Sequence, residues 1–148
     1  MEDFSCLKIK NQLCFPLYSV ANLIIRNYKP LLDKINLTYT QYITMMVLWE
    51  KENINEKELC DTLFLKSNTI TPLLKKLKEK GYIEINKNSK DQRNLVISLT
   101  PEGFELKKQA KEIPASIVKN VGINMEEAKY LYDILYKILE ANYDNLWF

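Results

Sequence analysis

The sequence contains no histidine, and this absence excludes several kinds of site at once. Ser-His-Asp triads, Cys-His dyads and histidine-ligated metal sites all require an imidazole ring. The cysteines Cys6, Cys14 and Cys60 are odd in number, and no two of them have the close spacing of a zinc-ligand pair. They therefore predict neither a disulfide framework nor a zinc site, and we expect no metal and no cofactor.

Long apolar runs and turn-forming residues are also scarce in the 148 residues. No stretch approaches the roughly 18 uninterrupted apolar residues that cross a membrane. The first twelve residues have two acids and no apolar block, so they do not resemble a secretory signal. Only three glycines and five prolines occur, which argues against a turn-rich all-β fold. We expect one domain with one core, in the cytoplasm, with free thiols and no membrane contact.

Positive charge is concentrated in one window, although the whole chain carries only +2. Between Lys66 and Arg93 the sequence has eight bases and three acids, a net charge of +5, so the rest of the chain carries −3. A basic stripe on an acidic body is typical of a surface that contacts a polyanion such as DNA. A solvated helix face has the same composition, so the charge pattern alone leaves both interpretations open.

Periodicity and capping residues predict a mostly helical chain with one hairpin. Pro16 is harmless only in a first turn, so an unkinked helix over about 12–35 should start between Leu13 and Pro16, with Cys14 in or beside its first turn. Further helices are predicted over 38–50, from the capping box at Asn55 to about Phe64, from a Ser67 cap to Lys80, from Pro101 with a kink at Pro114, and from an Asn124 cap onward. Alternating residues predict strands over 82–86 and 95–99.

The order of these elements is that of a winged helix-turn-helix. A short helix, a tight connection and a basic helix that ends at Gly81 precede a charged hairpin, with the wing over 86–94. Four large side chains share the apolar face of the second helix: Tyr42, Met45, Met46 and Trp49. The last helix has an apolar face made of Leu131, Ile134, Leu135, Ile138 and Leu139. This is more apolar surface than one small domain needs, so we expect a homodimer.

Several segments resemble one family of transcription regulators. NQLCF over 11–15, YKPLLDK over 28–34, LTYTQY over 37–42 and DQRN over 91–94 are similar to the MarR family of dimeric winged-helix regulators, and to its organic-hydroperoxide-sensing OhrR-type branch. The resemblance implies a mostly α fold with a two-stranded β-wing. It implies a single domain over 1–148, with a DNA-binding winged helix over about 38–100 and dimerisation helices over about 12–35 and 101–146.

The resemblance also implies a function. Such a protein is a DNA-binding repressor rather than an enzyme, and it releases a pseudo-palindromic double-stranded operator when an organic hydroperoxide oxidises one cysteine. The matching cysteine is Cys14, and the matching partners of its thiolate are Tyr28 and Tyr39. Members with two reactive cysteines carry the second in the C-terminal half, and this chain has no cysteine after Cys60. It therefore resembles the one-cysteine type, which a low-molecular-weight thiol completes.

The residues themselves leave two interpretations of Cys14 open. Unpaired amides and the positive dipole end at a helix N-terminus stabilise a thiolate, which is the form that peroxides oxidise to sulfenic acid. A free cysteine also packs well as a small hydrophobe. Cys60, between Leu59 and Leu63, is expected in the core, and Cys6 in a polar segment is expected to be exposed.

Spacing along the first helix constrains any site built on Cys14. Tyr28 lies fourteen positions later, which is roughly 21 Å along an α-helix and beyond the reach of a side chain. If Tyr28 bonds the thiolate, it must come from another subunit. Tyr18 is one turn from Cys14 and can line the same pocket in the same chain. With Phe15 and Tyr39 it would form an apolar pocket suited to an organic hydroperoxide.

The basic window supplies the candidates for DNA contact. In a helix-turn-helix the second helix lies in the major groove with its N-terminal residues on base edges. The candidates for base contacts are Ser67, Asn68, Thr69, Thr71 and Pro72. The candidates for phosphate contacts are Lys66, Lys75 and Lys76. On or beside the wing lie Lys87 and Lys90, with Arg93 as the candidate for the minor groove and Asp91 as its structural partner.

Two other functions stay open at this point. A thiol peroxidase would use the same Cys14 chemistry for turnover, but the only nearby arginine is Arg26, about three turns away, and a winged helix has no use in turnover. A MarR-type regulator that senses a small aromatic ligand would leave Cys14 inert.

Overall fold

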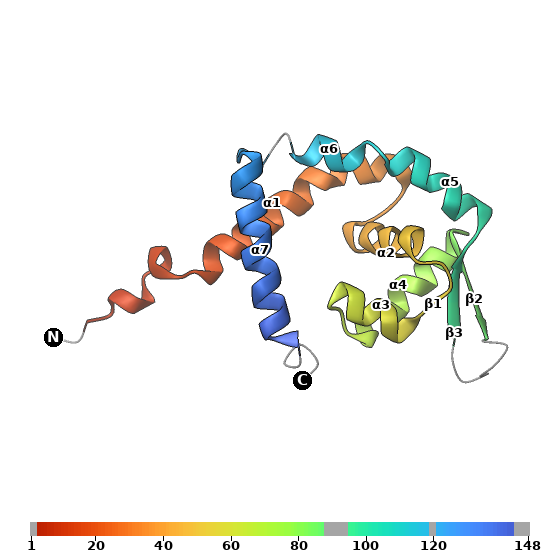
Figure 1. Cartoon of the computed structure of the whole chain (residues 1–148), viewed down its shortest axis with the longest axis horizontal. Helices are drawn as coiled ribbons and strands as arrows, with labels where there is room; N and C mark the ends of the chain where they lie inside the picture. Colours follow the sequence, from red (N-terminus) through yellow and green to blue (C-terminus); the bar gives the residue numbers. More distant parts are fainter. Residues whose placement is uncertain (1–2, 88–94, 119–120, 144–148) are drawn as a thin grey trace.

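Figure 1 shows the helices and strands of the computed structural model, which describes residues 3–87, 95–118 and 121–143. The α-helices are α1 (Cys14–Leu32), α2 (Tyr39–Glu50), α3 (Glu56–Leu63), α4 (Ser67–Glu79), α5 (Pro101–Ala110), α6 (Ile113–Val118) and α7 (Met125–Ala141). The 3-10 helices are η1 (Ser5–Leu7), η2 (Ile9–Asn11) and η3 (Asp33–Ile35). The strands are β1 (Ile54–Asn55), β2 (Ile83–Lys87) and β3 (Leu95–Leu99). No helix in these ranges is long and apolar enough to cross a membrane.

The molecule has a compact part and an open part (Figure 1). Helices α2, α3 and α4 and the three strands form the compact part, which we call the winged-helix lobe (residues 38–100). Helices α1 and α7 form the open part, which we call the helical frame. Helix α5 follows the lobe and connects it to α6, which packs on α1.

Side-chain caps set the start of several helices, as their sequences predict. At α2, Thr38 Oγ1 accepts from Gln41 N at 3.3 Å, and Thr38 N donates to Gln41 Oε1 at 3.1 Å. The same capping box opens α3 within 55–58 and α7 within 124–127. Thr100 caps α5 through its side chain. The predicted caps at Asn55, Thr100 and Asn124 are confirmed, whereas Thr38, predicted as the first residue of its helix, is the N-cap of α2.

Helix α1 begins at Cys14, inside the window that Pro16 predicts. Pro16 therefore lies in the first turn, where a missing N–H breaks no helical hydrogen bond. The helix ends at Leu32, and η3 extends the same segment to Ile35. The expected unkinked start, with Cys14 in the first turn, is confirmed.

Two predictions about α4 and α2 are wrong. Ser67 is the first residue of α4 rather than its cap, because Lys66 occupies the N-cap position with an extended backbone and no side-chain capping bond. Met46 is 44% exposed and does not share the buried face of α2 with Met45. Helix α2 is buried over most of its circumference, and Met46 lies on the remaining stripe with Glu50.

The expected long helix with a kink at Pro114 is also wrong. Helix α5 ends at Ala110, and a separate helix, α6, begins at Ile113. Pro114 therefore lies in the first turn of α6, where a proline fits without distorting a helix.

The sheet has three antiparallel strands in the order β1-β3-β2, one more than predicted. Ile54 of β1 pairs with Ile97 of β3, and a strand of two residues is too short for alternation to reveal. Strand β2 begins at Ile83, one residue later than predicted, because Tyr82 still belongs to the turn. That turn depends on Gly81, whose φ of 75° is the predicted left-handed conformation.

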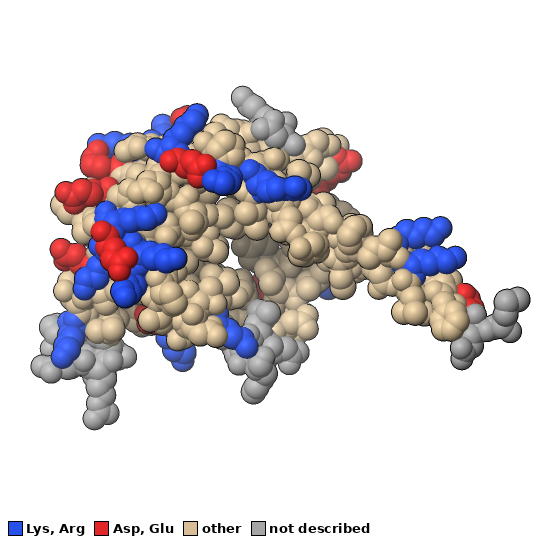
Figure 2. Space-filling view, turned by 180° about the vertical axis from the view of Figure 1, so that it is seen from behind, with Lys and Arg blue, Asp and Glu red and all other residues tan. Residues whose placement is uncertain are grey.

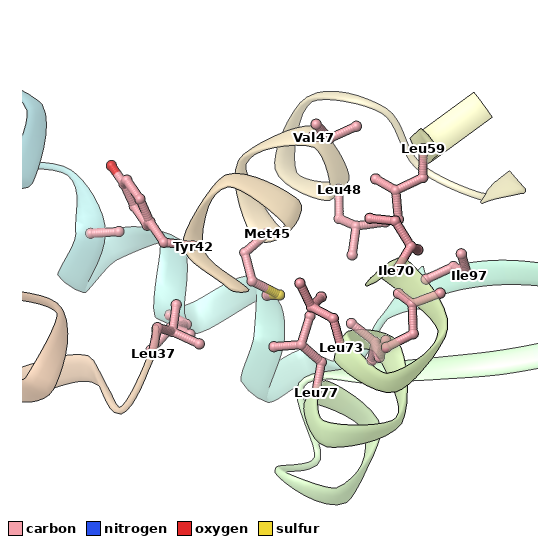
Figure 3. Close-up of a cluster of buried hydrophobic side chains, with 14 of the residues drawn as sticks. Leu37, Tyr42, Met45, Val47, Leu48, Leu59, Ile70, Leu73, Leu77 and Ile97 are labelled. Carbon is pink, nitrogen blue, oxygen red and sulfur yellow. The ribbon is translucent and has the colours of Figure 1, made fainter. Parts of the chain in front are cut away.

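Most of the hydrophobic core lies in the winged-helix lobe (Figure 3), and the C-terminal end of α1 together with α5 and α6 extends it. Side chains with no exposed surface come from α2, α3, α4 and β3: Met45, Leu59, Ile70, Leu77 and Ile97. Helix α5 is anchored to this lobe at Gly103, whose carbonyl accepts from Trp49 Nε1 at 2.9 Å. The lobe is therefore a packed unit that holds α4 in a defined position.

The helical frame buries much less of its apolar surface within one chain. No described residue of α7 is buried. Its exposed apolar side chains include Leu131, Ile134, Leu135 and Ile138. The first half of α1 is similar, with Phe15, Leu17, Val20 and Leu23 exposed. The predicted apolar face of α7 exists, but no described part of the same chain covers it.

Candidate redox site and DNA-binding surface

Cys14 is the first residue of α1, and it is exposed and free. The N-cap residue Leu13 makes no side-chain hydrogen bond to the first-turn amides, and no acid lies in that turn. The sulfur therefore lies at the positive end of the α1 dipole. The aromatic residues Phe15 and Tyr18 lie within the same turn and are 48% and 69% exposed.

Tyrosines from α1 and α2 gather near the other end of α1. The rings of Tyr28 and Tyr39 have centroids 5.1 Å apart. Tyr42 lies 5.7 Å from Tyr28, and Trp49 contacts Tyr42 edge-on at 6.3 Å. We call Tyr28, Tyr39 and Tyr42 the tyrosine cluster. Sequence periodicity assigns Tyr42 only to the core, and its spacing of three from Tyr39 is the signal that would have found it.

Burial raises the pKa values of the phenols in the tyrosine cluster. It raises the pKa of Tyr28, with a further increase from Tyr39, and it also raises the pKa of Tyr39. Burial, then Tyr28 and Tyr39, raise the pKa of Tyr42 to about 12. Within the described residues, neither the Tyr28 nor the Tyr39 hydroxyl donates a hydrogen bond. No described side-chain nitrogen or oxygen is buried without a partner, so both hydroxyls are accessible to solvent and can donate to a further group.

One chain does not bring Cys14 and the tyrosine cluster together. Helix α1 is continuous from Cys14 to Leu32, so Tyr28 lies roughly 21 Å along the helix from Cys14. Tyr39 packs on Tyr28 and is therefore also remote from Cys14. The fold separates the predicted site into two halves, one near each end of α1 (Figure 1).

The other two cysteines lie where their sequence context predicts. Cys60 is 5% exposed in the lobe core. Burial, with smaller effects from Glu56 and Asp61, raises the pKa of its thiol and disfavours the thiolate. Cys6 is exposed in η1. Its carbonyl accepts from Gln12 Nε2, which holds the turn that precedes α1.

Helix α4 presents the predicted DNA-contacting residues to solvent. Its exposed residues include Ser67, Asn68, Thr69, Thr71, Pro72, Lys75 and Lys76, with Lys66 exposed just before them. The opposite face of the helix, with Ile70 and Leu77, is buried in the lobe. Figure 2 shows lysines and arginines over the lobe and α5, with aspartates and glutamates among them. Lys87 ends β2 and is exposed. Lys90, Asp91 and Arg93 lie outside the described residues.

The Thr71 hydroxyl joins α4 to α3. Its oxygen lies 2.7 Å from Glu56 Oε1 and 2.8 Å from the Ser67 carbonyl oxygen. A hydroxyl has one proton to donate, so these two acceptors use it within the protein. Thr71 therefore offers a base edge an acceptor or a methyl group rather than a donor. Glu56 fixes the orientation of this side chain.

Comparisons with known proteins agree with this architecture. The family model described as "Transcriptional regulator SarA/Rot" matches residues 26–110. The organic hydroperoxide resistance transcriptional regulator of Bacillus subtilis is 41% identical over 138 residues, 93% of this chain and 94% of that protein. The structure of reduced AbfR bound to DNA, a protein of Staphylococcus epidermidis, has a TM-score of 0.77 at 31% identity and covers 91% of this chain and 94% of its own.

A MarR-like transcription regulator from Bacillus cereus has a TM-score of 0.75 at 25% identity, covering 89% of this chain and 96% of its own. These relatives are regulators of transcription rather than enzymes. Their similarity extends over both the winged-helix lobe and the helical frame. The chain therefore belongs to the MarR family of winged helix-turn-helix transcriptional regulators, in the branch of the organic hydroperoxide resistance regulators.

Proposed function

We propose that this regulator is a homodimeric repressor, which binds a pseudo-palindromic operator and releases it when an organic hydroperoxide oxidises Cys14. One observation carries the proposal. Cys14 is exposed at the positive end of α1, whereas Tyr28 and Tyr39, whose hydroxyls make no hydrogen bond within the described residues, lie near the other end of the helix. Each half of the site lacks what the other half supplies, and a second copy can join them.

The exposed apolar faces of the helical frame support a second copy of the chain as the partner. Contiguous apolar surface of this kind marks protein interfaces. Ala21 lies midway between Cys14 and Tyr28 in sequence. Two antiparallel α1 helices related by a two-fold axis near Ala21 would therefore place each Cys14 beside Tyr28 of the other chain. A small residue at the axis allows a close helix approach. In this arrangement 12–35 and 101–146 are the dimerisation segments.

The chemistry at Cys14 would be a two-electron oxidation. The thiolate attacks one peroxide oxygen and the O–O bond breaks. The leaving alkoxide takes a proton to give an alcohol, and Cys14 becomes a sulfenic acid. A low-molecular-weight thiol then forms a mixed disulfide with Cys14 and releases water. Phe15 and Tyr18 would offer the apolar surface that an organic hydroperoxide requires.

Loss of the thiolate supplies the driving force for release. Tyr28 and Tyr39 donate to the thiolate in the reduced dimer, and the neutral, bulkier sulfur species accepts these bonds poorly. A buried donor left without an acceptor costs about 1–3 kcal/mol, and the dimer has two such sites. This is sufficient to favour a second arrangement of the subunits, in which the two α4 helices no longer match the operator spacing.

On the DNA side, α4 would enter the major groove. Its exposed residues from Ser67 to Pro72 would face base edges, and Lys66, Lys75 and Lys76 would contact phosphates. Wing residues 87–93 would reach the neighbouring minor groove, with Arg93 inserted and Asp91 supporting it. The structure of the related protein AbfR has been solved in its reduced state bound to DNA.

The proposal also requires a compartment that is reducing and contains the genome, and the cytoplasm meets both conditions.

The deciding experiment compares wild type, Cys14→Ser and the matched control Cys6→Ser. Binding to a pseudo-palindromic duplex, selected from random sequences, is measured before and after one equivalent of cumene hydroperoxide, and intact-mass spectrometry reports the sulfur. We expect wild type and Cys6→Ser to release the duplex, and Cys14→Ser to bind it and ignore the peroxide. Release of Cys14→Ser to the same extent as wild type would reject the proposal and favour a ligand-sensing regulator. Sustained catalytic consumption of peroxide would instead indicate a thiol peroxidase.

A further inference from the structure

Lys80 differs from the exposed lysines of α4 because it is partly buried and its ammonium group donates to two oxygen atoms of the protein. Lys80 is the C-cap residue of α4, and Nζ donates to the Asn36 carbonyl at 2.7 Å and to Gln41 Oε1 at 2.9 Å. None of the ion pairs found among the described residues includes Lys80. Burial, and then the nearby Lys76, lower its pKa. A partly buried cation held by two neutral oxygens connects parts of the fold and is not free to contact DNA.

Both acceptors belong to the corner between α1 and α2. Asn36 follows η3 and has a left-handed backbone with φ of 54°. Gln41 is 3% exposed, and its Oε1 also accepts from Thr38 N at 3.1 Å in the capping box of α2. The same oxygen atom therefore receives the amide that caps α2 and the lysine that ends α4.

The tyrosine cluster adjoins the same corner. Tyr39 is the first residue of α2, between Thr38 and Gln41 in sequence, and its ring packs 5.1 Å from that of Tyr28. Thr38, Tyr39 and Gln41 lie within one helical turn, so the ring of Tyr39 is tied to the capping box through a short stretch of backbone. The hydrogen bonds of Lys80 link the capping box to the end of α4.

We propose that Lys80 is a positioning residue that couples the state of the tyrosine cluster to the orientation of the recognition helix α4. The inference rests on the proposed function, because it presumes that Tyr39 responds to the oxidation of Cys14. In the reduced protein, Lys80 holds the C-terminal end of α4 against the α1–α2 corner. When Tyr39 moves, Gln41 and Lys80 move with it, and α4 turns.

The test uses three substitutions in the full chain. Lys80→Met keeps an apolar stem and removes both hydrogen bonds. Lys78→Met is the matched control, because it removes the same charge two residues away, and the Lys78 side chain makes no hydrogen bond or ion pair within the described part of the chain. Lys80→Arg restores a cation with several donors. For each protein, the operator Kd is measured before and after cumene hydroperoxide, and intact mass reports the oxidation of Cys14.

We expect Cys14 to be oxidised equally fast in all four proteins, including wild type. The ratio of oxidised to reduced Kd should be at least about fivefold smaller in Lys80→Met than in Lys78→Met, a typical size for an allosteric coupling. Lys80→Arg should recover most of the wild-type ratio. If Lys80→Met melts below the assay temperature, Lys80→Gln, with a shorter neutral side chain, replaces it under the same criterion.

Two outcomes separate the two proposals. Equal ratios in Lys80→Met and Lys78→Met, with Cys14 oxidised in both, would overturn the role of Lys80 and leave the peroxide response intact. A wild type that keeps its operator after Cys14 has been oxidised would overturn the proposed function, and the role of Lys80 with it.

Discussion

Helices α2 and α7 begin with the same kind of capping box and carry similar apolar residues, yet their surroundings differ completely. In α2, Met45 and Leu48 are 0% and 1% exposed, because α1, α3, α4, α5 and the sheet surround the helix. In α7, Leu131 and Ile138 are 39% and 45% exposed. Local sequence thus specifies each helix and its apolar face but does not say what covers that face. We infer that a second chain covers α7.

Truncation of the lobe core should have the largest effect on stability. Met45→Ala leaves a cavity at a site with no exposed surface, and it should lower the free energy of unfolding by about 2–5 kcal/mol. Met46→Ala is the adjacent control, and it should change stability by less than about 0.5 kcal/mol because Met46 is on the surface. Urea unfolding followed by circular dichroism, at one fixed protein concentration, measures both. Equal losses would contradict the described burial of α2.

A charge on α7 should break the dimer and leave the lobe folded. Leu135→Asp should weaken self-association by about 2 kcal/mol or more, roughly 30-fold, as expected for a residue central to an interface. It should also abolish the proposed peroxide response, because the proposed site requires two chains. Lys129→Asp, on the polar side of α7, should remain dimeric. Sedimentation and circular dichroism distinguish dissociation from unfolding, and a Leu135→Asp protein that stays dimeric would place the interface elsewhere.

Gly103 tests the contact between α5 and the lobe. A Cβ at this position would lie 2.0 Å from the Tyr82 carbonyl oxygen, a backbone atom that cannot rotate away. Gly103→Ala should therefore destabilise the protein by about 1–3 kcal/mol, although alanine favours helices. Gln109→Ala on the exposed side of α5 should have little effect. Thermal unfolding of the two variants measures the difference in stability. A Gly103→Ala protein as stable as wild type would mean that α5 can move away from the Tyr82 carbonyl at no cost.

Tyr42 should contribute a smaller effect, confined to alkaline pH. Its pKa is raised from 10.0 to about 12, so the fold favours the protonated phenol. The stability that this preference confers is complete below the unfolded pKa and is lost as pH rises from about 10 toward 12. Tyr42→Phe should reduce the alkaline loss of stability, whereas Tyr130→Phe, at an exposed site, should not. Urea unfolding across pH 8–12, with tyrosinate absorbance, checks this prediction. Identical pH profiles for both variants would mean that ionisation of Tyr42 does not cause the alkaline loss of stability.

Features that depend on nearby residues could be predicted well from the sequence. The capping box of α2 needs only Thr38 and Gln41, and the start of α1 follows from the missing amide hydrogen of Pro16. Predictions failed where a distant neighbour sets the outcome. Strand β1 exists only because Ile54 pairs with Ile97, and Met46 is exposed because of how α2 is packed.

The candidate site divides in the same way. The position of Cys14 at a helix start, and its separation from Tyr28, follow from a rise of about 1.5 Å per residue and need no packing information. The pairing of Tyr28 with Tyr39, and the hydrogen bond from Lys80 to Gln41, join residues far apart in the chain. Such contacts form only when helices pack. Local patterns do not predict them, because many packing arrangements are compatible with the same patterns. Packing of the chain selects among those arrangements, and it leaves apolar faces of α1 and α7 that no other described segment covers.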